Sequence, residues 1–329
     1  MTTISHALMK ALRNGVRRCS DDALECLRGF VVGQWHESGG FCDRAGKADI
    51  YYTQFGLMLA RALGMKVNVS AVERFCWAHD TRSFDLVHAS CFVRSLLLAR
   101  PWFAWLRRRR IRRNCPFINL IEAAQTPYEQ FLALTLAQDA RLPFVKKSLD
   151  AYRSADGLYA NVPEAAEGGV NATSSAILVE LYLRDIKDNW DTRDTKDVRH
   201  HASPMSPVSP VSQSSHKFTS ARASSLSKSG GKPRALQNAA LALAQLERDD
   251  GSFCANPSTP FPDILSTASA HFALRTAGVQ PRNDAKVFVE ECFVEDAGGF
   301  AASPEGGTPD LEYTVYGVIL MGLLREFKI

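Results

Sequence analysis

The chain has 329 residues, of which 46% are hydrophobic and 22% charged, a balance that excludes a wholly disordered, collagen-like or coiled-coil protein. Its length fits two domains or one large one, and a formal net charge of +4 is too small to indicate nucleic-acid binding. The eight cysteines form no C-x-x-C pair, which favours reduced thiols in the cytoplasm.

Residues 1–20 are expected to form an N-terminal extension. Arg13, Arg17 and Arg18 interrupt its only apolar stretch, so no export signal is predicted and we expect a cytoplasmic protein. Downstream, apolar residues at helical spacing predict a series of amphipathic helices. These helices are expected at residues 21–33, 70–79, 101–113, 143–152, 235–248 and 284–295.

A Gly-aromatic turn recurs along the chain, and each copy is followed by a loop and an apolar helical segment. The turns are Gly39-Gly40-Phe41, Gly157-Leu158-Tyr159, Gly251-Ser252-Phe253 and Gly298-Gly299-Phe300. The full pattern D-x-x-x-T begins the apolar segments at 49–53, 263–267 and 310–314. Part of the pattern occurs at 85–89 and 169–173, and the weakest copy lies at 122–126. These repeats indicate six helical hairpins, each pairing an amphipathic helix with a more apolar one.

A stretch rich in Ser, Pro, Lys and Arg interrupts the repeats at residues 187–233. It holds too few apolar residues to offset the entropy of ordering it, so a disordered insertion is predicted. The hairpins then occupy residues 21–186 and 234–329 as one domain. The apolar run at 315–324 is about half of the ~20 residues that a spanning helix needs, so no membrane span is predicted.

An all-α fold follows from the six hairpins. A repeat protein of this kind either stays open as a solenoid or closes into a ring. The more apolar helices suit an inner ring that is enclosed by the amphipathic ones. This division favours closure into an α/α toroid (an α6/α6 barrel) with a central cavity.

The segment GFCDRAGKADIYYT at residues 40–53 resembles the form G-F-x-x-R-x-x-K-x-x-D-x-C-Y of protein prenyltransferase β subunits, with one residue fewer before the Asp. Squalene-hopene and related terpene cyclases share the toroid of that family, and the likeness covers nearly the whole chain outside the insertion. It implies an isoprenoid-handling enzyme, prenyltransferase-like or cyclase-like, that acts on a prenyl diphosphate or a polyprene. The alternative is a non-catalytic toroid that binds a lipid or serves as a protein-interaction scaffold.

The resemblance also implies roles for residues near the mouth of the cavity. The matching Arg44 and Lys47 would hold a diphosphate and stabilise the charge that develops on it. His88 is a further substrate-binding candidate. Aromatic residues would line the cavity and stabilise a carbocation, with core packing as the alternative. They are Tyr51, Tyr52, Phe55, Tyr313 and Tyr316.

Carboxylates at the helix starts are candidates for acid or metal chemistry. Asp49, Asp263 and Asp310, with Tyr313 beside the last, would meet at one rim, and a helix N-cap is the alternative role for each Asp. In the resembled prenyltransferases an Asp and a Cys on one helix and a His on the next hold zinc. Here Asp263 keeps its place, but Leu265 and Tyr313 replace the other two ligands, so that zinc site is not intact. The D-x-D-D acid motif of the cyclases is absent, and Mg²⁺ or Zn²⁺ stays open as a cofactor through Asp263.

A basic cluster stands apart from the repeats. Trp102 and Trp105 precede six arginines between Arg107 and Arg113. An aromatic anchor beside arginines is typical of peripheral contact with an anionic membrane, here the inner face of the cell membrane. A solvated helix face and an acidic protein partner are the alternatives, and nucleic acid is the least favoured partner.

Overall fold

The computed structural model describes residues 3–197 and 232–324, and most of them are helical. The all-α prediction is therefore confirmed at the level of fold class. Within these two ranges, none of the helices combines the length and the apolar character needed to cross a bilayer. Two short antiparallel ladders, not expected from the sequence, pair β1 (Phe41–Cys42) with β2 (Ala48–Asp49) and β3 (Phe293–Val294) with β4 (Gly299–Phe300).

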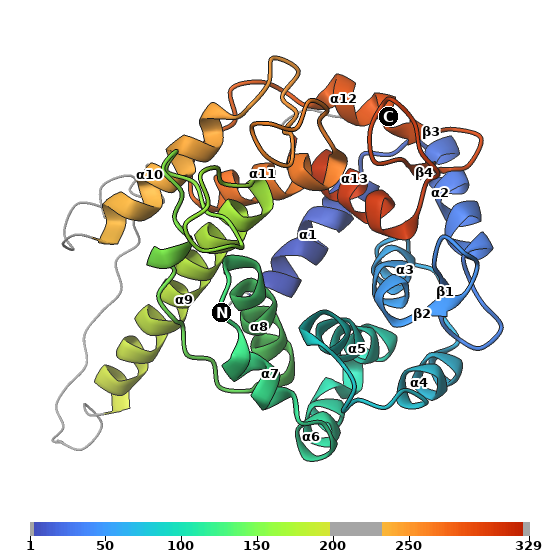
Figure 1. Ribbon diagram of the computed structural model, residues 1–329. Helices are drawn as coiled ribbons and strands as arrows, with labels where there is room; N and C mark the ends of the chain where they lie inside the picture. The colour runs from blue at the N-terminus through green and yellow to red at the C-terminus, as the bar shows by residue number, and fades with distance from the viewer. Residues whose placement is uncertain (1–2, 198–231, 325–329) are drawn as a thin grey trace, which may run out of the picture.

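Two sets of helices alternate along the chain. The more apolar set comprises α3 (Ile50–Ala62), α5 (Leu86–Ala99), α8 (Pro127–Ala140), α9 (Val170–Asp197), α11 (Ile264–Thr276) and α13 (Leu311–Leu323). Each of these helices packs against the next one in the chain, and α13 packs against α3, so their contacts run in a cycle (Figure 1).

The second set lies on the outer side of this cycle (Figure 1). It comprises α2 (Asp21–Gly33), α4 (Val69–Trp77), α6 (Ala104–Asn114), α10 (Lys232–Gln245) and α12 (Lys286–Glu291). Five of the six expected amphipathic helices are therefore present, with ends shifted by a few residues. Three shorter elements complete the helical part: η1 (Pro101–Phe103), α7 (Phe117–Ala123) and η2 (Asp150–Tyr152).

Where the D-x-x-x-T pattern is complete, its Asp caps the helix and its Thr fastens the preceding turn to that helix. Asp263 accepts a hydrogen bond from the backbone N–H of Ser266 (2.7 Å) and so caps α11. The hydroxyl of Thr267 donates to the carbonyl of Asp263 (2.8 Å) and accepts from the N–H of Phe253 (3.0 Å), the aromatic residue of the turn. The same two bonds recur at Thr53, Thr173 and Thr314.

The glycine two positions before the aromatic residue of each turn lets one unit pack against the next. Gly39, Gly157, Gly251 and Gly298 all have positive φ, which costs a residue with a side chain about 1–2 kcal/mol. A Cβ on Gly39 would overlap the backbone of Ala71 in α4, and a Cβ on Gly298 would overlap the backbone of Cys26 in α2. The first turn thus packs on the second outer helix, and the last turn packs on the first outer helix.

Residues 1–20 were expected to lie outside the repeats, but they include α1 (Ile4–Val16), which is part of the packed structure. Ile4 and Leu12 are fully buried. The helix crosses α13 where each of the two helices has a glycine. A Cβ on Gly15 of α1 would overlap the carbonyl of Val318, and a Cβ on Gly322 of α13 would overlap the carbonyl of Ala11. The expectation of a separate extension is corrected, because this close crossing ties α1 to the C-terminal helix.

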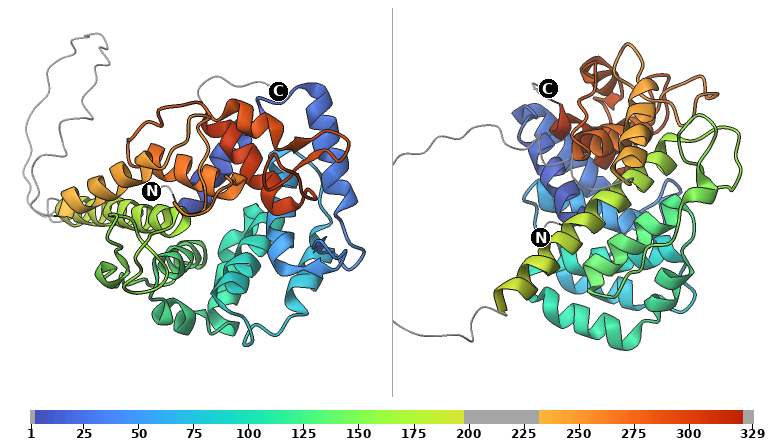
Figure 2. Two further views of the ribbon diagram at one scale, coloured as in Figure 1. Left: turned by 45° about the horizontal axis from the view of Figure 1, so that its top comes forward. Right: turned by 90° about the vertical axis from the view of Figure 1, so that its left-hand side faces the viewer.

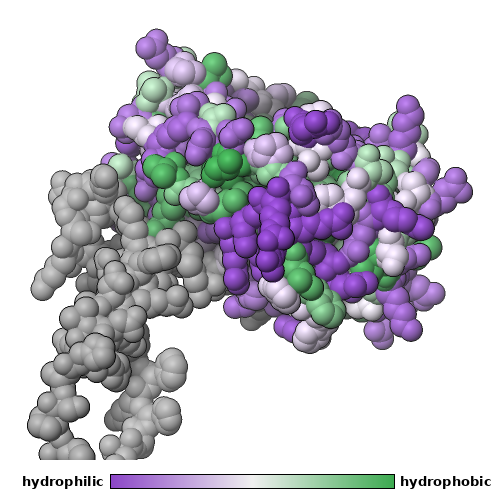
Figure 3. Space-filling view, turned by 90° about the horizontal axis from the view of Figure 1, so that it is seen from below, coloured by the Kyte–Doolittle hydropathy of each residue, from purple (hydrophilic) through white to green (hydrophobic). Residues whose placement is uncertain are grey.

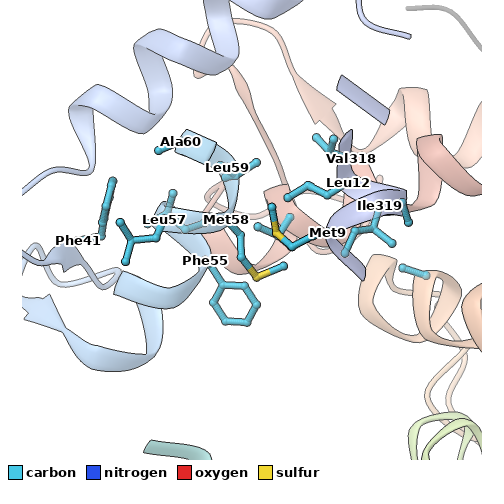
Figure 4. Packing of buried hydrophobic residues seen from close by; sticks show 14 of the residues in the cluster. Met9, Leu12, Phe41, Phe55, Leu57, Met58, Leu59, Ala60, Val318 and Ile319 are labelled. Atoms are coloured by element: carbon cyan, nitrogen blue, oxygen red, sulfur yellow. The ribbon is translucent and has the colours of Figure 1, made fainter. Parts of the chain in front are cut away.

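The hydrophobic core joins the two ends of the chain. In Figure 4, Met9 of α1 and Ile319 of α13 point toward Met58 and Phe55 of α3. Segments far apart in sequence therefore share one core. In the right-hand view of Figure 2, the long loops before α9 and α11 extend on the same side of the molecule.

Two predicted helix positions are corrected by the structure. Residues 143–152 form no helix apart from η2, because the N–H of Lys147 donates to the side chain of Gln130 in α8 (3.1 Å) instead of to a helical carbonyl. The D-x-x-x-T register expected at 122–126 is shifted by four residues. Thr126 is itself the N-cap of α8, with Pro127 at the first helical position and Glu129 completing a capping box.

The expected disordered segment, residues 187–233, lies mainly outside the described residues. Its first part, residues 187–197, continues α9, and residues 232 and 233 begin α10.

Candidate functional site

A cavity of about 340 Å³ lies among the helices of the apolar set. Residues from α3, α5, α8, α9, α11 and α13 line it, and Leu8 of α1 contributes as well. Small-molecule sites usually span about 300–1,000 Å³, so this cavity suits a small ligand. All six apolar helices contribute residues to the cavity, which makes it the candidate functional site.

The lining of the cavity is mostly apolar and rich in aromatic rings. The rings of Tyr51 and Phe55 meet edge to face with their centroids 4.9 Å apart, and Tyr316 lies 6.1 Å from Phe55. Phe131 and Phe272 add rings from α8 and α11. Tyr51, Phe55 and Tyr316, predicted from the sequence to line the cavity, are thus brought together there.

Glu312 is an acidic residue that lines this aromatic cavity. The hydroxyl of Tyr51 donates a short hydrogen bond to Glu312 Oε1, and no hydrogen bond within the described residues involves Oε2. Burial raises the pKa of Glu312, and Asp310 raises it further, whereas the hydrogen bond from Tyr51 and the charge of Arg44 act in the opposite direction. Glu312 is therefore a carboxyl group that holds its proton to a higher pH than usual.

An ion pair lies next to Glu312. Arg44 donates through Nε (2.7 Å) and Nη2 (2.6 Å) to Asp310 Oδ2, and its guanidinium lies 4.9 Å from the ring centroid of Tyr313. The hydroxyl of Tyr52 also points to Asp310 Oδ2, at 3.4 Å, and burial raises the pKa of Tyr52 to about 12. Arg44 is half exposed, whereas Asp310 is 4% exposed. The guanidinium thus neutralises a nearly buried carboxylate, and its own charge is already paired.

Asp49, Asp263 and Asp310 all act as helix N-caps. They accept hydrogen bonds from the backbone N–H groups of Tyr52 (3.0 Å), Ser266 (2.7 Å) and Tyr313 (2.8 Å). The capping role accounts for each carboxylate at the start of its helix. The three residues do not line the cavity.

The residues present do not fit the zinc site of the resembled prenyltransferases. Leu265, in the place of the thiolate ligand, lines the cavity with an apolar side chain, and Tyr313, in the place of the imidazole, lies under Arg44. Asp263 is left as a lone carboxylate engaged in capping. Within the described residues no group of three or more His, Cys, Asp or Glu side chains is arranged to hold a metal ion.

Four more of the sequence-predicted residues are not among those that line the cavity: Tyr52, Tyr313, Lys47 and His88. Lys47 has an exposed side chain at the end of the loop between β1 and β2. His88 is bonded through Nδ1 to Asp85 (2.8 Å) and stacks on Phe84, with its side chain 43% exposed. His88 therefore has a structural role at the start of α5.

Two charged cavity residues were missed in the sequence analysis: Glu312 and Arg94. Arg94 is nearly buried, bonded through Nε to Asp139 (3.2 Å) and through Nη2 to Ser5 of α1 (2.6 Å). Both residues interrupt otherwise apolar helical segments, α13 and α5. A single charge inside a helix expected to be buried on all sides was the available signal, because such a charge needs a partner or a cavity.

Comparison of the chain with protein-family models gives no match, and comparison with curated proteins gives none either.

Proposed function

We propose that the protein is an isoprenoid-handling enzyme with the α6/α6 toroid of prenyltransferases and terpene cyclases. The cyclic order of contacts among the six apolar helices supports the toroid. The observation that carries the function is a carboxyl group of raised pKa facing aromatic rings in an apolar cavity at the centre of that cycle. An acid placed in this way can protonate a carbon–carbon double bond, and the rings can stabilise the resulting cation.

The rim favours an uncharged substrate over a diphosphate. Arg44, the residue that matches the diphosphate-binding arginine, is already paired with Asp310 through two nitrogens. A diphosphate that took over this guanidinium would leave the carboxylate nearly buried without its ion-pair partner, a change that costs several kcal/mol. An isoprenoid hydrocarbon or alcohol needs no such change. Lys47, which is exposed in the loop between β1 and β2, is the other cation that matches the family, and its side chain forms no ion pair within the described residues.

In the proposed reaction Glu312 transfers its proton to one carbon of a terminal double bond. The π bond breaks, a C–H bond forms, and a tertiary carbocation develops near Tyr51, Phe55 and Tyr316. A second double bond of the same chain attacks this cation and forms a C–C bond. The carboxylate of Glu312 then removes a proton from a carbon next to the new cation, which gives a cyclic isomer and restores the acid. No co-reactant is consumed.

The test is incubation of the purified protein with linear terpene hydrocarbons and alcohols in D₂O, followed by gas chromatography and mass spectrometry. We expect a cyclic product that carries one deuterium from the acid. The Glu312→Gln variant should lose turnover by at least about 10³-fold and still bind the substrate, because the amide is nearly isosteric but is no acid. Glu305→Gln, an exposed substitution in the loop before α13, is the matched control and should keep full activity.

Allylic diphosphates and squalene, each with and without Mg²⁺ and Zn²⁺, are incubated in parallel. The proposal expects a prenyl alcohol to bind at least as tightly as its diphosphate. Tight binding of the diphosphate that Lys47→Ala abolishes would instead favour transfer chemistry at the rim.

A lipid-binding toroid without activity is the second candidate. The observation that favours it is that the residues of the resembled zinc site are incomplete and that the D-x-D-D motif is absent. A prenyl lipid that co-purifies with the protein, and that neither the parent nor Glu312→Gln converts, would decide for this second function.

A further inference from the structure

The exposed side of helix α6 carries large apolar residues next to arginines. Trp102 is 90% exposed, Trp105 is 59% exposed and Leu106 is 44% exposed. Arg109 and Arg113 follow at helical spacing, so the five residues lie along one face of the η1–α6 segment. We name these five residues the Trp-Arg face.

The arginine cluster divides into two groups by its contacts. Arg107 forms an ion pair with Glu73 of α4, and Arg110 lies with its guanidinium 4.0 Å from the ring centroid of Trp77. Arg108 donates to the carbonyl of Asp139 (2.6 Å), and Arg112 donates to the carbonyl of Ala140 (3.2 Å), both in the last turn of α8. These four arginines fasten α6 to its neighbours, and two of them satisfy carbonyls at the negative end of a helix.

Arg109 and Arg113 differ from the other four. Both are exposed, and no residue in the described ranges forms a hydrogen bond or ion pair with either. The chain has no acidic residue between positions 100 and 121, so no neighbouring carboxylate in sequence offsets their charge. The Trp-Arg face therefore offers an unpaired positive charge next to exposed indole rings.

The same side of the molecule is visible in Figure 3, which looks from below at the edge where α6 lies in Figure 1. Hydrophilic residues form a continuous band there, and hydrophobic residues lie beside it. A group of exposed apolar side chains bordered by polar residues is typical of a surface that contacts a protein or a membrane.

We infer that the Trp-Arg face binds the surface of an anionic phospholipid membrane. Tryptophan rings reside at the headgroup level of bilayers, and arginine attracts anionic lipids. A short helix that combines the two lies flat in the interface. The surface is independent of the cavity, so this inference holds whether or not the proposed reaction occurs.

The test is cosedimentation of the full-length chain with vesicles of phosphatidylcholine alone and of phosphatidylcholine with phosphatidylserine. Binding is expected only to the vesicles that contain phosphatidylserine, and it should weaken as the salt concentration rises. Each arginine near such a surface contributes about fivefold to partitioning, so Arg109→Gln/Arg113→Gln should lower the partition coefficient about 25-fold. Trp102→Ser/Trp105→Ser should reduce binding to the background and abolish the blue shift of tryptophan fluorescence.

The matched control is Arg28→Gln/Lys66→Gln, which removes two positive charges from exposed positions on other elements. It should change partitioning by less than about twofold, because charges farther from the surface than a Debye length are screened. All substituted residues are exposed, and circular dichroism should show that each variant is folded as the parent. Equal binding to both kinds of vesicle, undiminished binding of the Arg109→Gln/Arg113→Gln variant, or binding to a DNA duplex but to neither kind of vesicle would overturn the inference.

Discussion

At the scale of single residues, Glu312 is distinguished from the other carboxylates by its surroundings. Asp49 and Asp263 accept hydrogen bonds from free N–H groups at helix starts, and this capping role explains why a carboxylate stands at each of these positions. Glu312 lies past the cap of α13. Within the described residues, its one side-chain hydrogen bond comes from Tyr51, and aromatic rings line the space beside it. Burial is therefore the main influence on the pKa of Glu312, and burial raises this pKa.

The raised pKa of Glu312 leads to a prediction about stability and pH. The folded chain holds this proton more tightly than the unfolded chain, whose pKa lies near 4.5. The resulting stabilisation is complete below pH 4.5 and is lost as the pH rises through the pKa of the folded state. We expect the melting temperature of the parent to fall relative to that of Glu312→Gln between pH 4 and pH 7, measured by differential scanning calorimetry. A constant difference over this range would contradict the raised pKa.

At the scale of the elements, the Asp and Thr of the repeat stabilise the fold because they form hydrogen bonds to backbone groups of two segments at once. Thr267 lies in the first turn of α11, but its hydroxyl accepts from the N–H of Phe253, fourteen positions earlier. Phe253 and Thr267 are both fully buried, so water cannot replace this bond. The third unit lacks this arrangement, since Thr126 acts as an N-cap and a Pro follows it.

Loss of the Thr267 hydroxyl is predicted to destabilise the fold. Thr267→Val keeps the shape of the side chain but leaves the N–H of Phe253 buried without an acceptor, which should cost about 1–3 kcal/mol of unfolding free energy. Thr276→Val on the same helix is the control, because its hydroxyl only donates to the carbonyl of Phe272, four residues back. The control should lose less than about 1 kcal/mol in urea unfolding followed by circular dichroism. Equal losses in the two variants would show that the bond to the turn has no special weight.

At the scale of the whole molecule, the two ends of the chain hold each other in place. The last turn packs through Gly298 on α2, and α13 packs on α1 at Gly15 and Gly322. Contacts between segments about 300 residues apart are costly to form, because a long loop must close before they contribute. Once formed, they join the first and last helices around the cavity.

A pair of glycine substitutions tests this junction. Gly298→Ala places a side chain at a positive φ, which is strained, and its Cβ overlaps the backbone of Cys26. Gly46→Ala introduces the same kind of strain, with φ at 76°, but its Cβ meets open space. We expect Gly298→Ala to lower the unfolding free energy by about 1–3 kcal/mol more than Gly46→Ala, because only the first overfills a packed contact. Equal losses would show that the turn does not need to approach α2 closely.

Much of the fold and part of the site were predictable from the sequence. Helical periodicity placed five of the six amphipathic helices, and the repeated Asp and Thr placed the starts of α3, α11 and α13. The aromatic residues Tyr51, Phe55 and Tyr316 were correctly expected at the cavity. The segment 143–152 was missed because its backbone bonds to a side chain of α8, a contact that no local pattern records.

What the sequence determined by itself were features set by neighbours within about one repeat: helix periodicity, caps, glycine turns and the aromatic residues that follow them. These features rest on hydrogen bonds and side-chain spacing along a short stretch of chain. Only the tertiary structure decided that α1 belongs to the core, that Glu312 and not Asp49 faces the cavity, and that Arg109 and Arg113 are the arginines of α6 without a hydrogen-bond or ion-pair partner among the described residues. Each of these outcomes depends on which distant segments pack together, because packing is what removes one charge from water and leaves another exposed.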